Sequence, residues 1–319
     1  MKLAILDDYQ DVALKYGDWD RLRARGVEVT AFDRHLGAPD AAAKALAPFD
    51  AVLLMRERQP FPKALIDQLP NLKFVVLTGA RAPSMDLAAL TARAIPVSNT
   101  GTGGSSAPTA ELTWAVLMDA VRHVSAGDRL VRKGGWHKGL PMGFALEGKR
   151  LGVLGLGKLG SRVAGYAHAF GMEVVAWSQN LTAEKAAASG ATLVSKDELL
   201  ATSDVITIHL ILSGRTRGLI GAADIAKMKR GVILVNTSRG PIVEEAALVA
   251  ALKSGHIASA GLDTYDVEPM PPGHPLTTLD NVVLSPHLGY VVEPAFRAFY
   301  ADAIENILAW LDGKPIRVM

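Results

Sequence analysis

The 319-residue chain contains no cysteine, and this absence excludes several kinds of chemistry. Disulfide bonds, iron–sulfur clusters, thiolate zinc sites and cysteine nucleophiles cannot form without it. The histidines do not replace the missing thiolates, since no group of them has the spacing of metal ligands. The sequence therefore predicts no metal site.

Long apolar runs and an excess of one charge are also missing. No apolar run approaches the roughly 20 residues that cross a membrane. The first residues, MKLAILDDYQ, turn acidic too early for the core of a signal peptide. The net charge of +2 is too small to indicate a nucleic-acid partner. We therefore expect a soluble, cytoplasmic protein that binds neither membranes nor nucleic acid.

What the chain does contain is a regular alternation of short apolar runs and alanine-rich stretches of helical pattern. Its length favours two domains, and the runs fall into two series. Continuous apolar strands separated by helices are typical of a parallel sheet covered on both faces. The expected strands occupy residues 3–6, 27–32, 51–55 and 74–79, and then 150–157, 173–178, 205–210, 231–238, 259–264 and 281–286. The predicted fold class is α/β, with two doubly wound parallel-sheet domains and a cleft between them.

The domain boundaries depend on a glycine- and serine-rich stretch at residues 98–111, SNTGTGGSSAPTAE. One interpretation is a flexible linker, and the other is a crossover between domains whose loop approaches a ligand closely. A long helical pattern covers residues 109–134, and an amphipathic pattern over residues 293–313 is expected to return to the first domain. The predicted domains are a discontinuous substrate domain, 1–98 and 291–319, and a dinucleotide-binding domain, 99–290.

Gly155, Gly157 and Gly160 give the second series the spacing G-x-G-x-x-G. Such glycines permit a tight turn, close approach of the backbone to a pyrophosphate, and close packing of helix on strand. The pattern alone is weak, but here it follows a strand and opens a helix. The sequence therefore predicts a Rossmann dinucleotide-binding domain, beside a flavodoxin-like substrate domain.

The end of the next strand bears on the choice between NAD and NADP. An acidic residue at that place binds the ribose hydroxyls of NAD and repels a 2′-phosphate. Ser178 stands there instead, followed by Gln179. Loss of the acid favours NADP, but the nearest cation that could bind the phosphate is Lys185. NAD therefore stays open as the alternative.

Four ionisable residues lie at the ends of strands of the second series or in the loops that follow: Arg239, Asp263, Glu268 and His287. Functional groups in open parallel sheets gather beyond the carboxyl ends of the strands. Arg239 suits a substrate carboxylate, and His287 can donate or accept a proton near neutral pH. Glu268 would orient the His287 ring, and Asp263 would meet the nicotinamide. Such a set suits the reduction of a 2-oxo acid.

Together these motifs resemble the D-2-hydroxyacid dehydrogenase family over nearly the whole chain. The resemblance rests on LGLGKLG, VNTSRGPIVEEAAL, AGLDTYDVEP and NVVLSPHLGY, which occur in family order. It implies that Arg239, Glu268 and His287 form a catalytic triad. It also implies that the stretch at residues 98–111 is a crossover loop beside the nicotinamide, and that LTGA (77–80) offers backbone amides to the substrate carboxylate.

Besides Ser178, which replaces the usual acid, two further positions depart from the family pattern. Thr109 takes a place where the family usually has valine, and HLIL lacks the proline that usually follows the position of His209. By the same resemblance, the expected cofactor contacts are Gly155, Gly157, Lys158, Leu159, Gly160, Ser178, Gln179, His209, Thr216, Thr237, Ser238, Arg239, Asp263, His287 and Thr109. The expected substrate contacts are Thr78, Gly79, Ala80, Arg239 and His287.

The resemblance implies an NAD(P)-dependent oxidoreductase that moves a hydride between a nicotinamide cofactor and a small D-2-hydroxy acid or 2-oxo acid. Glyoxylate and hydroxypyruvate are the leading substrates, because they offer little beyond a carboxylate and a carbonyl. A phosphoglycerate dehydrogenase is an alternative, for which Arg56, Arg58 and Arg81 are the available extra cations. A second alternative is a nicotinamide-responsive, corepressor-like binding protein. The family also implies a homodimer formed through the nucleotide-binding domain.

Overall fold

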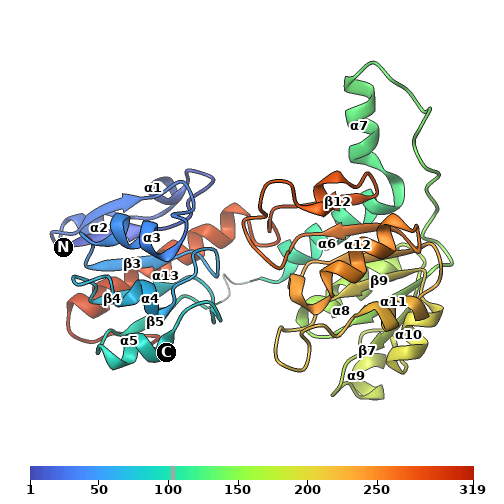
Figure 1. Cartoon of the computed structure of the whole chain (residues 1–319). Helices are drawn as coiled ribbons and strands as arrows, with labels where there is room; N and C mark the ends of the chain where they lie inside the picture. Colours follow the sequence, from blue (N-terminus) through green and yellow to red (C-terminus); the bar gives the residue numbers. More distant parts are fainter. Residues whose placement is uncertain (102–104) are drawn as a thin grey trace. The chain divides into compact units, whose positions relative to one another are not determined.

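In the computed structural model, which describes residues 1–101 and 105–319, the chain divides into two compact units (Figure 1). Unit 1 consists of Met1–Ser105 and Val291–Met319, and unit 2 consists of Ser106–Tyr290. Unit 1 extends beyond residue 98, where the sequence pattern places the boundary. The reason is that Asn99 still pairs in a strand of unit 1, and the next residue donates its N–H to Leu77 O at 3.0 Å.

Unit 1 is built on a parallel sheet that has, in the described residues, five strands in the order β2-β1-β3-β4-β5. These strands are β1 (Lys2–Ile5), β2 (Glu28–Ala31), β3 (Ala51–Leu54), β4 (Phe74–Leu77) and β5 (Val97–Asn99). The helices are α1 (Ala13–Tyr16), α2 (Asp20–Arg23), α3 (Pro39–Leu46), α4 (Lys63–Ile66), α5 (Leu87–Ala92) and α13 (Glu293–Leu311). Every residue of β3 and β4 is buried, as continuous apolar runs predict. The last helix, α13, packs against β4, β5, α1 and α2.

Unit 2 is built on a second parallel sheet, with seven strands in the described part of the chain and the order β12-β11-β10-β9-β6-β7-β8. They are β6 (Arg150–Leu154), β7 (Glu173–Trp177), β8 (Thr192–Leu193), β9 (Val205–Ile208), β10 (Val232–Asn236), β11 (Ile257–Leu262) and β12 (Val282–Leu284). The helices are α6 (Ala107–Arg122), α7 (Val124–Arg132), α8 (Lys158–Ala169), α9 (Ala183–Ala187), α10 (Lys196–Thr202), α11 (Ala222–Lys227) and α12 (Glu245–Lys253), with the 3-10 helices η1 (Gly240–Ile242) and η2 (Pro275–Thr278). The sequence does not predict β8, because a two-residue strand is too short to show an apolar pattern.

The two parallel-sheet α/β units confirm the predicted fold class. In unit 2 the first strand, β6, lies inside the sheet and pairs with both β7 and β9. The strand order therefore reverses at β6. In open parallel sheets, ligands bind outside the carboxyl ends of the strands near such a reversal.

The long helical pattern at residues 109–134 is in fact two helices, α6 and α7. His123 separates them with a left-handed backbone (φ 57°), which ends α6. The Asp119 carboxylate then accepts a hydrogen bond from Ser125 N–H (2.8 Å) in the first turn of α7. No residue of α7 is buried, and Figure 1 shows this helix standing away from the sheet of unit 2.

Among the described residues, no helix is long and apolar enough to cross a membrane.

Candidate active site

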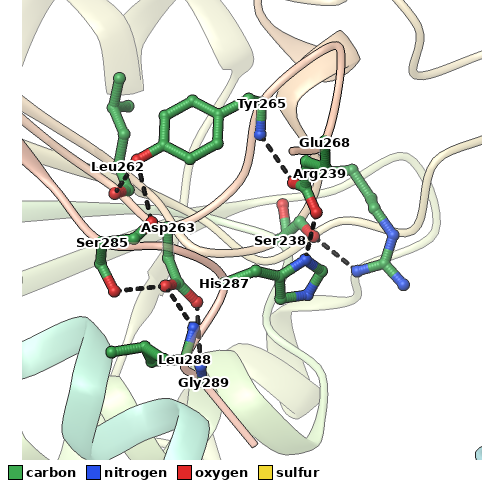
Figure 2. Close-up of polar contacts among 10 residues, drawn as sticks. All are labelled: Ser238, Arg239, Leu262, Asp263, Tyr265, Glu268, Ser285, His287, Leu288 and Gly289. Atoms are coloured by element: carbon green, nitrogen blue, oxygen red, sulfur yellow. Dashed lines mark hydrogen bonds and ion pairs between the residues drawn. The ribbon is translucent and has the colours of Figure 1, made fainter. Parts of the chain in front are cut away.

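Three neighbouring strands of unit 2 carry the four ionisable residues on the loops beyond their carboxyl ends (Figure 2). Arg239 follows β10, Asp263 and Glu268 follow β11, and His287 follows β12. Because β12, β11 and β10 are adjacent and parallel, these loops meet at one edge of the sheet. The sheet order thus gathers side chains that are far apart in the sequence.

His287 and Glu268 form a short hydrogen bond, with 2.6 Å between Nδ1 and Oε2. The other carboxylate oxygen of Glu268 accepts a hydrogen bond from Tyr265 N–H at 2.9 Å. Burial alone would raise the pKa of Glu268, but the hydrogen bond and charge of His287, the Tyr265 N–H and the charge of Arg239 together lower it. Glu268 is therefore a carboxylate at neutral pH. Since it only accepts, Nδ1 of His287 carries the hydrogen, and Nε2 is left to exchange a proton with a ligand.

The loop that carries His287 is held by Asp263, which is 1% exposed. His287 itself has a left-handed backbone (φ 55°), which a residue with a side chain rarely adopts without support. Asp263 supplies the support by accepting hydrogen bonds from Ser285 Oγ–H (2.6 Å) and from the N–H groups of Leu288 (2.7 Å) and Gly289 (3.0 Å). Burial raises the pKa of Asp263 although these hydrogen bonds and the charge of His287 oppose the rise. Asp263 thus positions the His287 loop.

The loop that carries Arg239 is held in a similar way by Asn236, the last residue of β10. The Asn236 amide donates to Arg239 O (2.9 Å) and accepts from the N–H (3.1 Å) and hydroxyl (3.0 Å) of Ser238. Gly240 then allows this loop to approach the next one, because a methyl group here would lie 2.2 Å from the carbonyl carbon of Tyr265. Asn236 is not among the site residues that the sequence predicts. A polar residue at the end of a continuous apolar strand was the available signal.

A row of threonines on or next to α6 joins the same loops. Thr113 Oγ1 lies 2.7 Å from Thr237 Oγ1 and 2.7 Å from Thr109 O. Thr109 Oγ1 donates to Gly289 O at 2.8 Å. The N-terminal half of α6 is therefore tied both to the loop before Arg239 and to the loop after His287.

The glycine-rich turn between β6 and α8 fits the pyrophosphate of a dinucleotide. Gly155 has φ 101°, and a methyl group there would lie 2.7 Å from the carbonyl oxygen of His209. A methyl group on Gly160 would lie 2.1 Å from the Gly155 carbonyl oxygen. A methyl group on Gly157, by contrast, would meet no atom within 4 Å. The first and third glycines make the turn, and the second leaves open space at the start of α8, as a phosphate held by helix N–H groups requires.

These contacts agree with the comparison with known proteins. Residues 114–289 match the family model described as D-isomer specific 2-hydroxyacid dehydrogenase, NAD binding domain. The chain belongs to this family. It is therefore an oxidoreductase that acts on the CH–OH group of 2-hydroxy acids with a nicotinamide cofactor.

Relatives and solved structures agree with this assignment. The dehydrogenase is 41% identical over 257 residues to the glyoxylate reductase of Aeropyrum pernix, covering 78% of this chain and 76% of that one. It is 32% identical to the hydroxypyruvate reductase of Blautia hydrogenotrophica, covering 100% and 99%. A crystal structure of a putative D-3-phosphoglycerate dehydrogenase from Ralstonia solanacearum has a TM-score of 0.92 and 36% identity, covering 99% of this chain and 96% of that chain.

The remaining cofactor residues predicted for the dehydrogenase lie around the same sheet edge. Lys158 and Leu159 form the first turn of α8. Ser178 and Gln179 directly follow β7, the neighbour of β6, and the serine carbonyl accepts a hydrogen bond from Leu181 N–H at 3.1 Å. The residue directly after β7 is thus a serine and not a carboxylate.

His209, which follows β9, is neutral in the folded dehydrogenase. Burial lowers its pKa to about 3. The residue as a whole is partly exposed, but its ring nitrogens are enclosed. Nε2 lies 2.9 Å from Thr207 Oγ1. Nδ1 is buried and has no hydrogen-bond partner within the described residues. Thr216, in the loop that follows, donates to Ile211 O (2.6 Å) and accepts from Ser213 N–H (2.8 Å). Its hydroxyl therefore shapes this loop, and a cofactor contact from Thr216 stays a prediction.

The substrate loop predicted at Thr78, Gly79 and Ala80 follows β4 in unit 1. Two of its amides are already used, since Thr78 N–H donates to Leu54 O (2.9 Å) and Gly79 N–H donates to Thr100 Oγ1 (3.1 Å). The sequence cannot show this, because both acceptors come from other parts of the chain.

Within residues 1–101 and 105–319, no group of His, Asp and Glu side chains could hold a metal ion.

Proposed function

We propose that this dehydrogenase reduces small 2-oxo acids, with glyoxylate and hydroxypyruvate as its leading substrates. The observation that carries the proposal is the Glu268–His287 pair, which has a guanidinium on the adjoining loop. A histidine with Nδ1 held by a carboxylate presents Nε2 as a proton donor, and Arg239 supplies a cation for a carboxylate. Relatives named glyoxylate reductase and hydroxypyruvate reductase support this substrate range.

In the direction of reduction, each residue has a separate task. Arg239 binds the substrate and polarises its carbonyl group. His287 donates the proton on Nε2 to the carbonyl oxygen, while the hydrogen bond from Nδ1 to Glu268 keeps the ring aligned. Asn236 and Asp263 keep the two loops in place. The nicotinamide, when bound, supplies the hydride.

The proposed cofactor is NADP, with NAD as the alternative. The glycine turn holds the pyrophosphate of either one. Ser178 and Gln179 offer hydrogen bonds without the negative charge that would repel a 2′-phosphate. Lys185 lies in α9, the helix that follows this loop.

Two other functions are kept as alternatives. A phosphoglycerate dehydrogenase is supported by the name of the Ralstonia solanacearum structure. A nicotinamide-responsive, corepressor-like binding protein would need the fold but not the His287 proton. The complete set of Arg239, Glu268 and His287 favours catalysis over that alternative.

We further propose that the dehydrogenase is a homodimer formed through unit 2. Helix α7, which projects from the sheet of unit 2 and is here called the arm, supports this proposal, because no residue of that helix is buried. Its Val124 and Val131 side chains are 64% and 53% exposed, and Trp136 and Met142 in the following segment are 69% and 95% exposed. Apolar side chains gathered on one projecting element mark an interaction surface.

The cytoplasmic location expected from the sequence stays a prediction, which cell fractionation would check.

Oxidation of NADPH and of NADH with glyoxylate, hydroxypyruvate, phosphohydroxypyruvate and bulkier 2-oxo acids tests the function. We expect turnover with the two small acids, faster with NADPH. His287→Ala should lower kcat by about 100- to 10,000-fold, because it removes the proton donor. His137→Ala, at an exposed site away from the loops, is the matched control. Tight cofactor binding without turnover of any acid would exclude the reductase and favour the binding protein.

A further inference from the structure

Tyr265 takes part in the site through two separate groups, its backbone N–H and its side-chain hydroxyl (Figure 2). The N–H donates to Glu268 Oε1 at 2.9 Å. The hydroxyl lies 2.9 Å from Ser285 O and 3.2 Å from Leu262 O. A hydroxyl has one hydrogen to donate, so the shorter contact, to Ser285 O, is the main hydrogen bond. Because Ser285 lies just before Pro286 and His287, one tyrosine contacts both the Glu268 loop and the His287 loop.

These contacts form a closed hydrogen-bond circuit around the proton donor. Ser285 O accepts a second hydrogen bond, from His287 N–H at 3.0 Å. His287 bonds through Nδ1 to Glu268 Oε2 at 2.6 Å, and the other oxygen of Glu268 accepts the Tyr265 N–H. The path thus returns to the tyrosine, and every member of the circuit is held at two points.

The surroundings of Tyr265 keep its hydroxyl a fixed donor. The residue is 9% exposed, and burial raises the pKa of the phenol, a rise to which the charge of Asp263 adds. The hydroxyl therefore keeps its hydrogen at neutral pH. The backbone is confined as well, because a methyl group on Gly240 would lie 2.5 Å from the Tyr265 carbonyl oxygen. A residue fixed in both its backbone and its side chain can transmit the position of one loop to the other.

We propose that Tyr265 is a positioning residue for proton transfer, which holds the Glu268 carboxylate and the His287 ring at their short separation. The two side chains stand on loops that follow different strands, β11 and β12. Without the hydroxyl, Asp263 still holds the His287 loop, but the Glu268 loop loses this link to it. This inference rests on the proposed function for the role of His287 as the proton donor.

Tyr265→Phe removes the hydroxyl and keeps the aromatic ring. We expect kcat for glyoxylate to fall by about 5- to 50-fold, because proton transfer depends on alignment of the reacting groups. The KM should stay within about threefold, since Arg239 is unchanged. Tyr166→Phe, at a half-buried tyrosine of α8 whose ring packs against Trp114, is the control and should leave kcat unchanged.

Two amino-acid analogues at position 265 separate the donor from its volume. Tyr265→4-aminophenylalanine keeps an N–H donor in place of the hydroxyl, and it should restore most of the lost kcat. Tyr265→4-methylphenylalanine has a group of similar size without a donor, and its kcat should stay as low as that of Tyr265→Phe. Equal kcat values in the two analogues would show that the hydrogen bond is not what matters, and the proposal would be wrong.

A double-mutant cycle distinguishes positioning from a general loss of stability. If Tyr265 acts through Glu268, its hydroxyl matters little once that carboxylate is gone. Adding Tyr265→Phe to Glu268→Ala should therefore lower kcat by less than about twofold further. A loss of the same size in both backgrounds, or an unchanged kcat in Tyr265→Phe alone, would overturn the proposal.

Failure of the proposed function is recognised by a measurement without turnover. Amide hydrogen exchange followed by NMR reads the N–H groups of residue 265 and His287, which both donate within the circuit. In Tyr265→Phe both should exchange about 5- to 10-fold faster, whereas Leu181 N–H, bonded to Ser178 O in the same unit, should be unaffected. If this holds and no acid is reduced, the positioning of the pair by Tyr265 stands and the proposed function fails. If both amides keep the wild-type rate, the assignment of Tyr265 is wrong whatever the turnover.

Discussion

The two carboxylates beside His287 have opposite shifts in pKa because their surroundings differ. Burial acts on both, but Glu268 faces the charge of His287 and of Arg239, and its pKa falls. Asp263 is more deeply enclosed, and burial outweighs its three hydrogen bonds, so its pKa rises. One carboxylate is a charged partner of the proton donor, and the other is an internal acceptor that shapes a loop.

We expect the stability lost in Glu268→Gln to depend on pH. The folded pKa of Glu268 lies below the ordinary value of 4.5, so its contribution is fully present above about pH 4.5 and is lost as the pH falls through the folded pKa. Urea unfolding of the wild type and Glu268→Gln between about pH 3 and pH 7 measures the difference. A difference in unfolding free energy that stays constant over this range would contradict the expectation.

His209 gives a dependence on pH of the same sign, but over a higher range of pH. Its folded pKa of about 3 lies below the ordinary 6.5, so the unfolded chain binds a proton that the folded one does not. The wild type should therefore lose stability relative to His209→Gln as the pH falls from 6.5 towards 3, by at most about 1.4 kcal/mol per pH unit.

The matched control for His209→Gln is His137→Gln, because His137 is exposed. Its unfolding free energy should follow that of the wild type across this range. If the unfolding free energy of His209→Gln also follows that of the wild type across this range, the pKa of His209 is not lowered in the folded protein. The expectation would then be wrong.

At the scale of elements, α6 connects two loops of the site through threonine side chains. Thr109→Val keeps the shape of the side chain but removes the donor to Gly289 O. We expect it to lower the free energy of unfolding by about 1 kcal/mol and to lower kcat/KM by less than about tenfold, since the loop after His287 loses one tie. Thr202→Val at the exposed end of α10, where the hydroxyl also donates to a carbonyl, is the control. Equal losses in both variants would show that the Thr109 contact is not specific to the site.

The strands that support the site were predictable, and the details of the loops were not. The continuous apolar runs at β6, β9, β10 and β11 predict buried parallel strands, and the charged residues behind them predict the edge where the site lies. The break at His123 was not predictable, because the helical pattern continues through it and only the left-handed backbone ends α6. The use of the Gly79 amide was also hidden, since its acceptor, Thr100, is brought near by the pairing of β4 with β5.

At the scale of the whole molecule, the arm at α7 gives the dimer proposal a direct test. Val131→Asp places a charge on the exposed apolar face, and we expect it to convert a dimer to a monomer at micromolar concentration. Leu14→Asp, on an equally exposed apolar side chain of unit 1, should leave the mass unchanged. Sedimentation equilibrium measures both. A wild type that is monomeric, or a Val131→Asp variant that stays dimeric, would exclude this arm as the interface.

The division of unit 1 into two chain segments affects the order in which the protein is completed during synthesis. The strands β1–β5 leave the ribosome long before α13, whereas unit 2 is continuous and can fold as soon as it has emerged. Until α13 arrives, β4 lacks its cover, including Trp310, which stacks on Phe74 with ring centroids 4.8 Å apart. Unit 1 therefore begins before unit 2 and is completed after it, and its apolar sheet is open to aggregation or chaperone binding during that interval.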